Sequence, residues 1–586
     1  MNDTVRFQTK SKMLLYFLKG TKLYFALGII FTCVLSFVEL INPKVIGYTV
    51  DGLIDDPEYF KGRLLFIALF VIVVALFGAL FRYFNGLFNA KGAEILVKNM
   101  RDGLFEQIMY LPYAWHGQNK TGDIIQRCTS DVDTVKRFLS EELMTLLRTI
   151  VMIVFSVAFM TTINIRLTIV AFISIPIIVG YSLIFHKKIG SAFFKVDTQE
   201  GVVSTIAQEN LTGVRVVRAF GREAYERERF HEQNEAYTNL WVHMMQILSS
   251  FWASMDVISG LQILVVLSLG AVFCVNGSMT AGEYVSFIAY NAMLTWPVRE
   301  LGRIIADMSK AGISIDRIRF IMNSAREEDE EKCSDFPSKL DIDFENVSFA
   351  YDDVNVLSDL SLHIEEGQTI GILGKTGSGK STLVQLLDRL YTLKDGEGCI
   401  KIGGVDIRKL RKSDLRQAVG LILQEPHLFS RTLGGNIGIE IEDSINGDEL
   451  QNRIDEAVKV AHLNNTVAKF KEGLNTPVGE RGVTLSGGQK QRTAIASVMI
   501  KKPPILVFDD SLSAVDTKTD EAIRKSIKEN TKNTTVILIS HRITTLKMAD
   551  KIFVLDKGKL IESGNHKELL EKNGLYKKIY DLQCYQ

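Results

Sequence analysis

Three short stretches of the 586-residue chain carry residues whose types and spacing could do chemistry. In the first, GILGKTGSGKST, Gly374, Gly379, Lys380 and Ser381 have the GxxxxGK[ST] spacing between an apolar strand and a helix. Backbone N–H groups of such a turn converge on phosphate at a helix N-terminus, while the lysine reaches the β- and γ-phosphates and the serine ligates Mg²⁺. The pattern predicts a nucleoside triphosphate site formed by Gly374, Lys375, Thr376, Gly377, Ser378, Gly379, Lys380, Ser381 and Thr382.

The second stretch, ILVFDDSLSAVD, is an apolar strand that ends in two adjacent carboxylates. Asp509 is predicted to support the Mg²⁺ ion through water, because an apolar strand that delivers an acid beside a phosphate loop is how such sites hold the metal. The next residue, Asp510, stands where nucleotide-hydrolysing sites usually place a longer acid. The third stretch, TLSGGQKQR, precedes a predicted helix, and by itself a Ser-Gly-Gly turn there indicates only a helix cap.

Length and hydropathy describe the elements that must position these residues. A chain of 586 residues is too long for a single core, and 47% hydrophobic residues with a mean hydropathy of +0.12 indicate that part of it lies in lipid. Lys+Arg and Asp+Glu are equal at 68 each, so the net charge gives no indication of a nucleic-acid partner. The six cysteines show no CxxC spacing and indicate neither a metal site nor a disulfide framework.

Six apolar segments are predicted to cross the membrane. Four are free of charge over about 17 to 19 residues, long enough for a helix to span about 30 Å of hydrocarbon. The first and last are shorter, and the last, which contains Pro297, could also be a buried soluble helix. In chain order the segments are residues 23–38, 64–81, 149–165, 167–185, 257–275 and 284–298.

The connections between these segments indicate the orientation in the membrane. Those after the first, third and fifth segments are short, and the longest of them, with Asp51 and Asp55, is acidic. Those after the second and fourth are about 60 to 70 polar residues long, have helical periodicity and carry many basic groups, such as Lys91 and Lys187. The positive-inside rule therefore predicts that the N-terminus and both long connections are cytoplasmic, and six spans return the C-terminal half to the same side.

A change of pattern divides the chain into domains. We predict a transmembrane domain over residues 1–323 and an acidic, proline-containing linker over residues 324–339. From residue 340 to 586, short β-branched strands alternate with helices, which is typical of an α/β domain.

Because TLSGGQKQR lies between the phosphate loop and the strand that ends at Asp509, this half of the chain resembles an ABC ATPase. With its six predicted spans, the chain is similar over essentially its whole length to the half-transporters of the ABC exporter family. The resemblance implies an α-helical transmembrane domain, with six spans and long cytoplasmic helical extensions, followed by an α/β P-loop ABC-type nucleotide-binding domain. It also implies ATP and Mg²⁺ as cofactors, a bilayer, and a second half-transporter as partner.

The remaining motifs of the family match by position. Tyr351 of FENVSFAY matches the aromatic residue that stacks on adenine, and Gln424 of LILQEPHLFS matches the glutamine that touches Mg²⁺ and the attacking water. Asp516 closes the D-loop, and His541 of LISHR matches the histidine that hydrogen-bonds the γ-phosphate. The implied metal site is Ser381, Gln424 and Asp509, and the signature that completes the ATP site of the opposite subunit is Leu485, Ser486, Gly487, Gly488 and Gln489.

Asp510 departs from the family pattern, in which the residue after the Walker B aspartate is a glutamate acting as general base. Loss of one methylene retracts the carboxylate by about 1.5 Å, and displacements near 1 Å can cost about 10²-fold in rate. The resemblance therefore implies a degenerate site, one that binds ATP but hydrolyses it slowly, in a heterodimer whose other subunit carries the glutamate. A homodimer in which Asp510 serves as a slow base is the alternative.

Three function classes share these motifs. About six spans exclude a soluble ABC ATPase of DNA repair or translation. A regulatory or ATP-gated channel subunit remains as an alternative to export, and within export a homodimeric lipid or peptide exporter is an alternative to efflux of amphiphilic compounds or drugs across the plasma membrane. Residues 113–124 and 209–223 resemble the family's cytoplasmic coupling segments. Residues that could line a substrate cavity are Phe251, Trp252, Met255, Phe287, Tyr290, Met293 and Trp296, and Glu39 and Arg148 could form a polar cavity contact or an ion pair.

Overall fold

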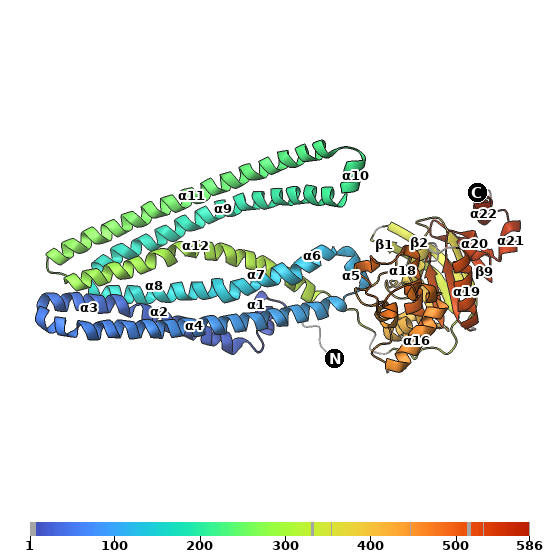
Figure 1. Ribbon diagram of the computed structural model, residues 1–586, viewed down its shortest axis with the longest axis horizontal. Coiled ribbons are helices and arrows are strands. Elements are labelled where there is room, and N and C mark those ends of the chain that lie inside the picture. The colour runs from blue at the N-terminus through green and yellow to red at the C-terminus, as the bar shows by residue number, and fades with distance from the viewer. Residues whose placement is uncertain are drawn as a thin grey trace. The chain divides into compact units, whose positions relative to one another are not determined.

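The computed structural model separates into two compact units (Figure 1). The first comprises residues 1–111 and 119–326, and the second comprises residues 112–118 and 327–586. The structure describes residues 7–329, 333–352, 354–445, 447–511, 517–530 and 533–584.

The first unit is built from long helices. At 1.5 Å per residue, the 53-residue helices α4 and α11 are each about 80 Å long, so an apolar segment long enough to span a membrane and the polar segment next to it form one continuous helix. Helices α9 and α11 run side by side and are joined by α10 (Figure 1). The bounds are α1 Lys10–Phe17, α2 Lys22–Glu39, α3 Ile41–Asp55, α4 Pro57–Met109, α6 Thr121–Gln126, α7 Val132–Arg137, α8 Leu143–Ile163, α9 Ile165–Thr212, α10 Val214–Ala219, α11 Glu223–Val275 and α12 Ala281–Asn323, with π-helical turns at Arg127–Asp131 and Phe138–Glu142.

The helix α12 differs from the other predicted spans. It is 43 residues long and contains the sixth predicted segment, but its apolar run ends at Val298 and is followed by Arg299 and Glu300, so it is less apolar than the others. Its side chains Phe287 and Tyr290 are almost fully buried, in a core shared with α8, α9 and α11. The sixth span therefore stays a prediction, while five helical segments in the described part of the chain are long and apolar enough to cross a membrane: Lys22–Asp55, Pro57–Met109, Thr121–Ile163, Ile165–Thr212 and Glu223–Val275.

The acidic segment after the first span, predicted as a short connection, is itself helical. The helix breaks at Leu40 and resumes as α3, because Pro43 lacks an N–H and its ring crowds the carbonyl four residues earlier. Two carbonyls at this break accept hydrogen bonds from α12: the Tyr290 hydroxyl donates to the Leu40 oxygen at 3.0 Å, and the Ser286 hydroxyl to the Pro43 oxygen at 2.9 Å. Side chains of α12 thus stabilise the break between α2 and α3.

An ion pair of Glu39 with Arg148, one of the two predicted possibilities, is confirmed. One Glu39 oxygen lies 2.8 Å from Arg148 and the other 2.9 Å from Arg82, so the carboxylate links α2 with α4 and α8. A charge at membrane depth is costly unless it is paired, and the two arginines satisfy both oxygens.

The second unit contains two sheets. The smaller is antiparallel, with the order β2-β1-β4-β5, and the larger has the order β10-β9-β3-β8-β7-β6 and is parallel except at β10. The strands are β1 Ile342–Tyr351, β2 Val354–Ile364, β3 Thr369–Gly374, β4 Cys399–Ile402, β5 Val405–Asp406, β6 Val419–Ile422, β7 Ile505–Asp509, β8 Thr535–Ile539, β9 Lys551–Asp556 and β10 Lys559–Gly564.

Both faces of the larger sheet are buried, as expected for parallel strands that read as continuous apolar runs. In β7, Ile505 and Val507 join the core beneath the smaller sheet, whereas Leu506 and Phe508 join the core on the opposite face. The helices that accompany the sheets are α5 Tyr113–Gln118, α13 Lys380–Leu387, α14 Lys412–Ala418, α15 Leu433–Gly438, α16 Gly447–Val460, α17 Asn464–Val467, α18 Gly487–Met499, α19 Thr517–Asn530, α20 Ile543–Leu546, α21 His566–Glu571 and α22 Leu575–Cys584.

The close approach of α3 and α12 gives a stability prediction. A Cβ atom at Gly47 would overlap the Ser286 hydroxyl and the Gly282 carbonyl, whereas one at Gly62 meets nothing within 4 Å. Gly47→Leu should therefore destabilise the protein by about 1–3 kcal/mol or more, the usual cost of overpacking, and Gly62→Leu should be tolerated. Thermal unfolding of both variants in the same detergent measures the difference; equal melting temperatures would contradict this packing.

Candidate functional sites

Three neighbouring parallel strands place the predicted nucleotide residues at one edge of the larger sheet. Ile372 of β3 and Asp509 of β7 both pair with Ile539 of β8. The phosphate loop after β3, the acids at the end of β7 and the segment after β8 with His541 therefore leave the sheet at the same level. This is the edge at which open α/β sheets bind ligands.

The loop Lys375–Gly379 turns sharply between β3 and α13 because two glycines adopt left-handed backbone angles. Gly377 has a φ of 80° and Gly379 a φ of 94°. A Cβ atom on Gly379 would also lie 2.5 Å from the Leu357 Cδ2 atom, so no side chain fits there. The loop conformation thus requires the glycines that the motif supplies.

Lys380 folds back over this loop. Its Nζ donates to the carbonyl oxygens of Gly374 at 2.9 Å and Lys375 at 2.8 Å. Burial lowers the pKa of the Lys380 ammonium, and the nearby charges of Asp509 and Asp510 partly oppose that shift. Phosphate oxygens can replace the two carbonyls as acceptors, which fits the predicted contact with the β- and γ-phosphates.

Ser381 and Asp509 meet beside the loop. The Ser381 hydroxyl donates to the Asp509 Oδ1 atom at 3.1 Å, and Asp509 is only 9% exposed. Burial raises the pKa of the Asp509 carboxyl, and the Ser381 hydrogen bond offsets part of the rise. A hydroxyl next to a carboxylate fits Mg²⁺, which takes few protein oxygens and completes its octahedron with water and phosphate. Gln424, the third predicted ligand, is exposed in the loop after β6.

Asp510 is held by the segment after β8. Its backbone has a φ of 43°, and its N–H donates to the Ile539 oxygen at 2.9 Å. The Ser540 hydroxyl lies 3.3 Å from one carboxylate oxygen, and the His541 Nδ1 lies 2.9 Å from the other. The carboxylate is 13% exposed, whereas His541 is 60% exposed. Both carboxylate oxygens of Asp510, the residue at the predicted base position, therefore have hydrogen-bond partners in the segment that follows β8.

Tyr351, the predicted adenine platform, is anchored to the helix that follows the phosphate loop. Its hydroxyl lies 2.8 Å from the Gln385 Oε1 and 3.2 Å from the Thr382 Oγ1. Burial raises the pKa of the Tyr351 phenol, so the hydroxyl stays a hydrogen-bond donor. The ring itself remains partly exposed.

The signature residues form the start of α18. Ser486 caps this helix, and its capping box with Gln489 satisfies two backbone N–H groups. Leu485 is buried, Gly487 is exposed, and Gly488 lies in the first turn. In the described part of the chain, no hydrogen bond or ion pair joins these residues to the phosphate loop of the same chain. Asp516 lies outside the described residues.

Sequence reasoning missed two side chains of this site. Ser540 contacts Asp510, and Gln385 contacts Tyr351. Ser540 could have been found from its place directly before His541 in the motif LISHR. Gln385 has no sequence signal, because its role depends on which turn of α13 lies next to β1.

The residues predicted to line a substrate cavity divide into two groups. Trp252 and Trp296 are 37% and 57% exposed and stack at 5.6 Å with an interplanar angle of 15°. Met293 is partly buried against the core. Four others are at most 2% exposed and pack between helices: Phe251, Met255, Phe287 and Tyr290.

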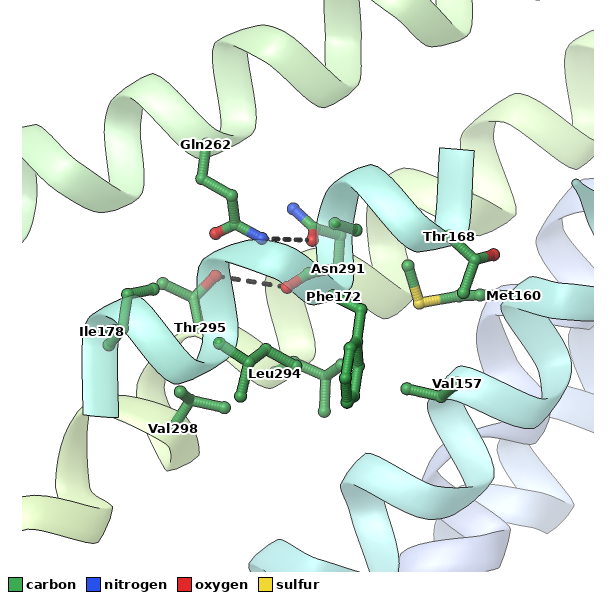
Figure 2. Close-up of a pocket in the computed structure, with 12 residues that line it drawn as sticks. Val157, Met160, Thr168, Phe172, Ile178, Gln262, Asn291, Leu294, Thr295 and Val298 are labelled. Atoms are coloured by element: carbon green, nitrogen blue, oxygen red, sulfur yellow. Dashed lines mark hydrogen bonds between the residues drawn. The ribbon is translucent and has the colours of Figure 1, made fainter. Parts of the chain in front are cut away.

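Figure 2 shows a pocket among α8, α9, α11 and α12 that is lined by apolar side chains and one amide pair. The Gln262 amide donates to the Asn291 Oδ1 at 2.8 Å, and the Thr295 hydroxyl donates to the Asn291 carbonyl at 3.2 Å. The cavity of about 10 Å³ has room for a single water molecule and is too small for an amphiphile. The amide pair thus ties α11 to α12.

Comparison with known proteins agrees with this geometry. Residues 25–298 match the family described as ABC transporter transmembrane region, and residues 357–513 match the family ABC transporter. The "Probable multidrug resistance ABC transporter ATP-binding/permease protein YheI" of Bacillus subtilis (strain 168) is 33% identical over 98% of this chain and 97% of its own length. The chain belongs to the ABC transporters. It is accordingly an ATP-hydrolysing, multi-pass membrane transporter.

Other relatives place this ABC transporter among the exporters. The "ATP-dependent lipid A-core flippase" of Pseudomonas aeruginosa PAO1 is 29% identical over 99% of this chain and 98% of its own length. The solved structure of a bacterial Atm1-family ABC exporter with ATP bound superposes with a TM-score of 0.83 at 25% identity, covering 96% of this chain and 99% of that chain. The predicted fold class, a helical transmembrane domain followed by an ABC nucleotide-binding domain, is therefore confirmed.

The position of Lys380 gives a binding prediction. Lys380→Ala should weaken ATP binding at this chain's own site, because it removes the ammonium group that lies over the phosphate loop. Assembly with a second subunit should be retained. Photocrosslinking of an ATP analogue to the purified transporter measures occupancy. The matched control, Lys459→Ala, removes an exposed lysine from the last turn of α16. Unchanged occupancy in Lys380→Ala would contradict the phosphate-loop assignment.

A buried acid lies at the other end of the helix α13. Asp388 is 8% exposed, and its Oδ1 atom is buried with no hydrogen-bond partner among the residues that the structure describes. Burial raises the pKa of the Asp388 carboxyl from 3.8 to about 7, although Arg416 and Lys501 favour the ionised form. The native state thus keeps a proton on Asp388 at pH values where the unfolded chain has lost it.

This proton predicts a pH dependence of stability. As the pH rises from about 4 to about 7, the unfolded state binds fewer protons than the native state, so Asp388 lowers the free energy of unfolding, by at most about 4 kcal/mol. Asp388→Asn mimics the protonated form and should be more stable than the wild type above pH 7 but similar near pH 4. Melting temperatures across this range test it. Parallel curves for both proteins would contradict the raised pKa.

Proposed function

We propose that this chain is one half of a heterodimeric ABC exporter whose own Walker site is degenerate. The observation that carries the proposal is the state of Asp510. An aspartate is one methylene shorter than glutamate, and both of its carboxylate oxygens already have partners in Ser540 and His541. A general base must come within about 2.6–3.2 Å of the attacking water, and a retracted, engaged carboxylate is poorly placed to do so.

ATP binding at the same site is expected to be retained. Lys380 and Ser381 hold the positions required for phosphate and metal, and Asp509 accepts the Ser381 hydrogen bond. When bound, Mg²⁺ would neutralise charge on the β- and γ-phosphate oxygens. In our proposal Ser381 and Gln424 contact the ion, Asp509 acts through water, Tyr351 stacks on adenine, and His541 hydrogen-bonds the γ-phosphate.

The signature supports a hydrolytic site in the opposite subunit. Ser486 caps the 13-residue helix α18, whose N-terminus favours a negatively charged ligand. Within the described residues, the signature and the phosphate loop of this chain share no hydrogen bond, and we propose that Leu485 to Gln489 close over ATP held by the partner. Asp516 of the D-loop belongs to the same proposed interface.

The proposed substrates are amphiphilic compounds or drugs taken from the cytoplasm or the inner leaflet. The relative named for multidrug resistance supports this class, and the exposed Trp252–Trp296 pair offers apolar aromatic surface for it. The relatives named as lipid A-core flippases favour a second candidate, a homodimeric lipid exporter.

The proposed orientation follows the distribution of basic residues. The N-terminus and the nucleotide-binding domain are cytoplasmic, and the chain is a multi-pass protein of the plasma membrane. We propose domain limits of 1–323 for the transmembrane domain, 324–339 for the linker and 340–586 for the nucleotide-binding domain, which agree with the end of α12 at Asn323 and the start of β1 at Ile342.

Neutralising the acid tests the proposal. If Asp510 is a poor base, Asp510→Asn should lower steady-state ATPase of the purified complex only modestly, whereas Glu→Gln at the equivalent position of the partner should lower it by about 10²-fold or more. Asp510→Glu should add at most part of a second hydrolytic site. Asp443→Asn, which removes an exposed carboxylate from a loop, serves as the control.

If Asp510→Asn lowers the steady-state ATPase activity of the complex as strongly as the partner's substitution does, both sites hydrolyse ATP and the degenerate-site proposal is wrong. If this chain alone assembles and hydrolyses ATP at the rate of a competent transporter, the homodimer is correct.

A further inference from the structure

The helix α22 holds the segment that carries His541. Gln583, near the end of α22, makes two hydrogen bonds with the backbone of this segment through its side-chain amide. The Gln583 Oε1 accepts from the Ile543 N–H at 2.9 Å, and its Nε2 donates to the His541 carbonyl oxygen at 2.7 Å. One side chain therefore fixes the backbone on both sides of Arg542, where the chain passes from β8 into α20.

The bond to Ile543 has the role of a helix cap. Ile543 is the first residue of α20, and the N–H groups of a first helical turn have no partner inside their own helix. Such groups are commonly satisfied by the side chain of a residue just before the helix. Here the acceptor belongs to Gln583, which lies 40 residues later in the chain. The conformation of the segment after β8 thus depends on where α22 lies.

The helix α22 is itself anchored at its start. Glu562 of β10 accepts hydrogen bonds from the backbone N–H groups of Leu575 and Tyr576. The Tyr576 ring is fully buried, and its hydroxyl lies 2.7 Å from the His566 Nδ1 of α21. Tyr576 also belongs to the core that contains Ile543. The Gln583 amide is therefore held out from a helix whose position is set by β10, α21 and this core.

The position of the His541 ring depends on this backbone. The ring is exposed, so packing does little to fix it, and its Nδ1 lies 2.9 Å from the Asp510 carboxylate. Asp510 is held from the sheet, because its N–H donates to the Ile539 oxygen. A displacement of residues 541–543 would consequently move the imidazole relative to the end of β7, while the phosphate loop stays in place.

We propose that Gln583 is a positioning residue, which holds the backbone at residues 541–543 so that the His541 imidazole reaches the γ-phosphate of ATP. The inference rests on the proposed contact of His541 with that phosphate. It makes the preference of this site for ATP over ADP depend on α22, through a side chain that acts on the backbone of the site. Binding of the base and of the α- and β-phosphates should not depend on Gln583.

Competition binding on the purified full-length complex tests this role. Mg-ATP and Mg-ADP compete separately against a photoreactive ATP analogue, and the label on this chain gives the ratio of the two affinities. Gln583→Met removes both hydrogen bonds and keeps the length of the side chain. It should lower the preference for ATP by about 3- to 10-fold, within the loss of one hydrogen bond to a charged group, and leave the affinity for ADP unchanged.

Two further variants separate positioning from general stability. His541→Ala should lower the preference for ATP at least as much as Gln583→Met does. In the double variant, the substitution at Gln583 should have no additional effect, because it acts through His541. Lys578→Ala, which removes an exposed lysine from the same helix, is the matched control and should bind both nucleotides as the wild type does.

Each outcome supports or refutes a distinct claim. If His541→Ala leaves the preference for ATP unchanged, the proposed γ-phosphate contact is wrong, and this inference fails with it. If His541→Ala lowers the preference and Gln583→Met does not, the positioning role is refuted while the γ-phosphate contact stands. The same conclusion follows if Gln583→Met weakens ATP and ADP equally, or if its effect persists in the double variant.

Discussion

Parallel pairing of β8 with both β3 and β7 is the constraint on which the nucleotide site depends. Because Ile372 of β3 and Asp509 of β7 both pair with Ile539, the two strands end at the same level. The phosphate loop, Asp509 and the Ser540–His541 segment therefore lie at one edge of the sheet, although they are far apart in the sequence. Burial of both sheet faces then holds this register, because a shift of one residue in β7 would exchange Val507 with Phe508 between two different cores.

The same register explains the chemistry at Asp510. Its backbone N–H is bound to the Ile539 carbonyl, so the carboxylate starts from a fixed point beside β8 and reaches Ser540 and His541. A longer acid could extend past these partners toward a water molecule, whereas an aspartate held in this way cannot extend further. In our proposal, nucleotide binding and nucleotide hydrolysis are therefore separable in this site: binding would depend on the glycines of the phosphate loop and on Lys380, and cleavage would depend on the reach of the acid at position 510.

Local sequence predicted most of this arrangement. The glycine spacing predicted a phosphate-binding turn between a strand and a helix, and the run ILVF followed by Asp509 predicted a buried strand that ends in an acid, because each signal lies within a few residues. The helical extension of the first span past Leu40 was not predicted, since its bend is stabilised by Tyr290 and Ser286, about 250 residues away in sequence. The contact of Gln385 with Tyr351 was missed for the same reason, because only the tertiary fold brings α13 next to the end of β1.

The central claim is that ATP bound by this chain is hydrolysed slowly while the partner's is turned over. Vanadate trapping measures this most directly: the complex is incubated with a photoreactive ATP analogue and vanadate under turnover conditions, irradiated, and the label on each subunit is counted. Our account predicts that, without vanadate, both subunits bind the analogue, and that the vanadate-trapped diphosphate is found on the partner. Equal trapping on both subunits, or trapping in a complex made only of this chain, would contradict it.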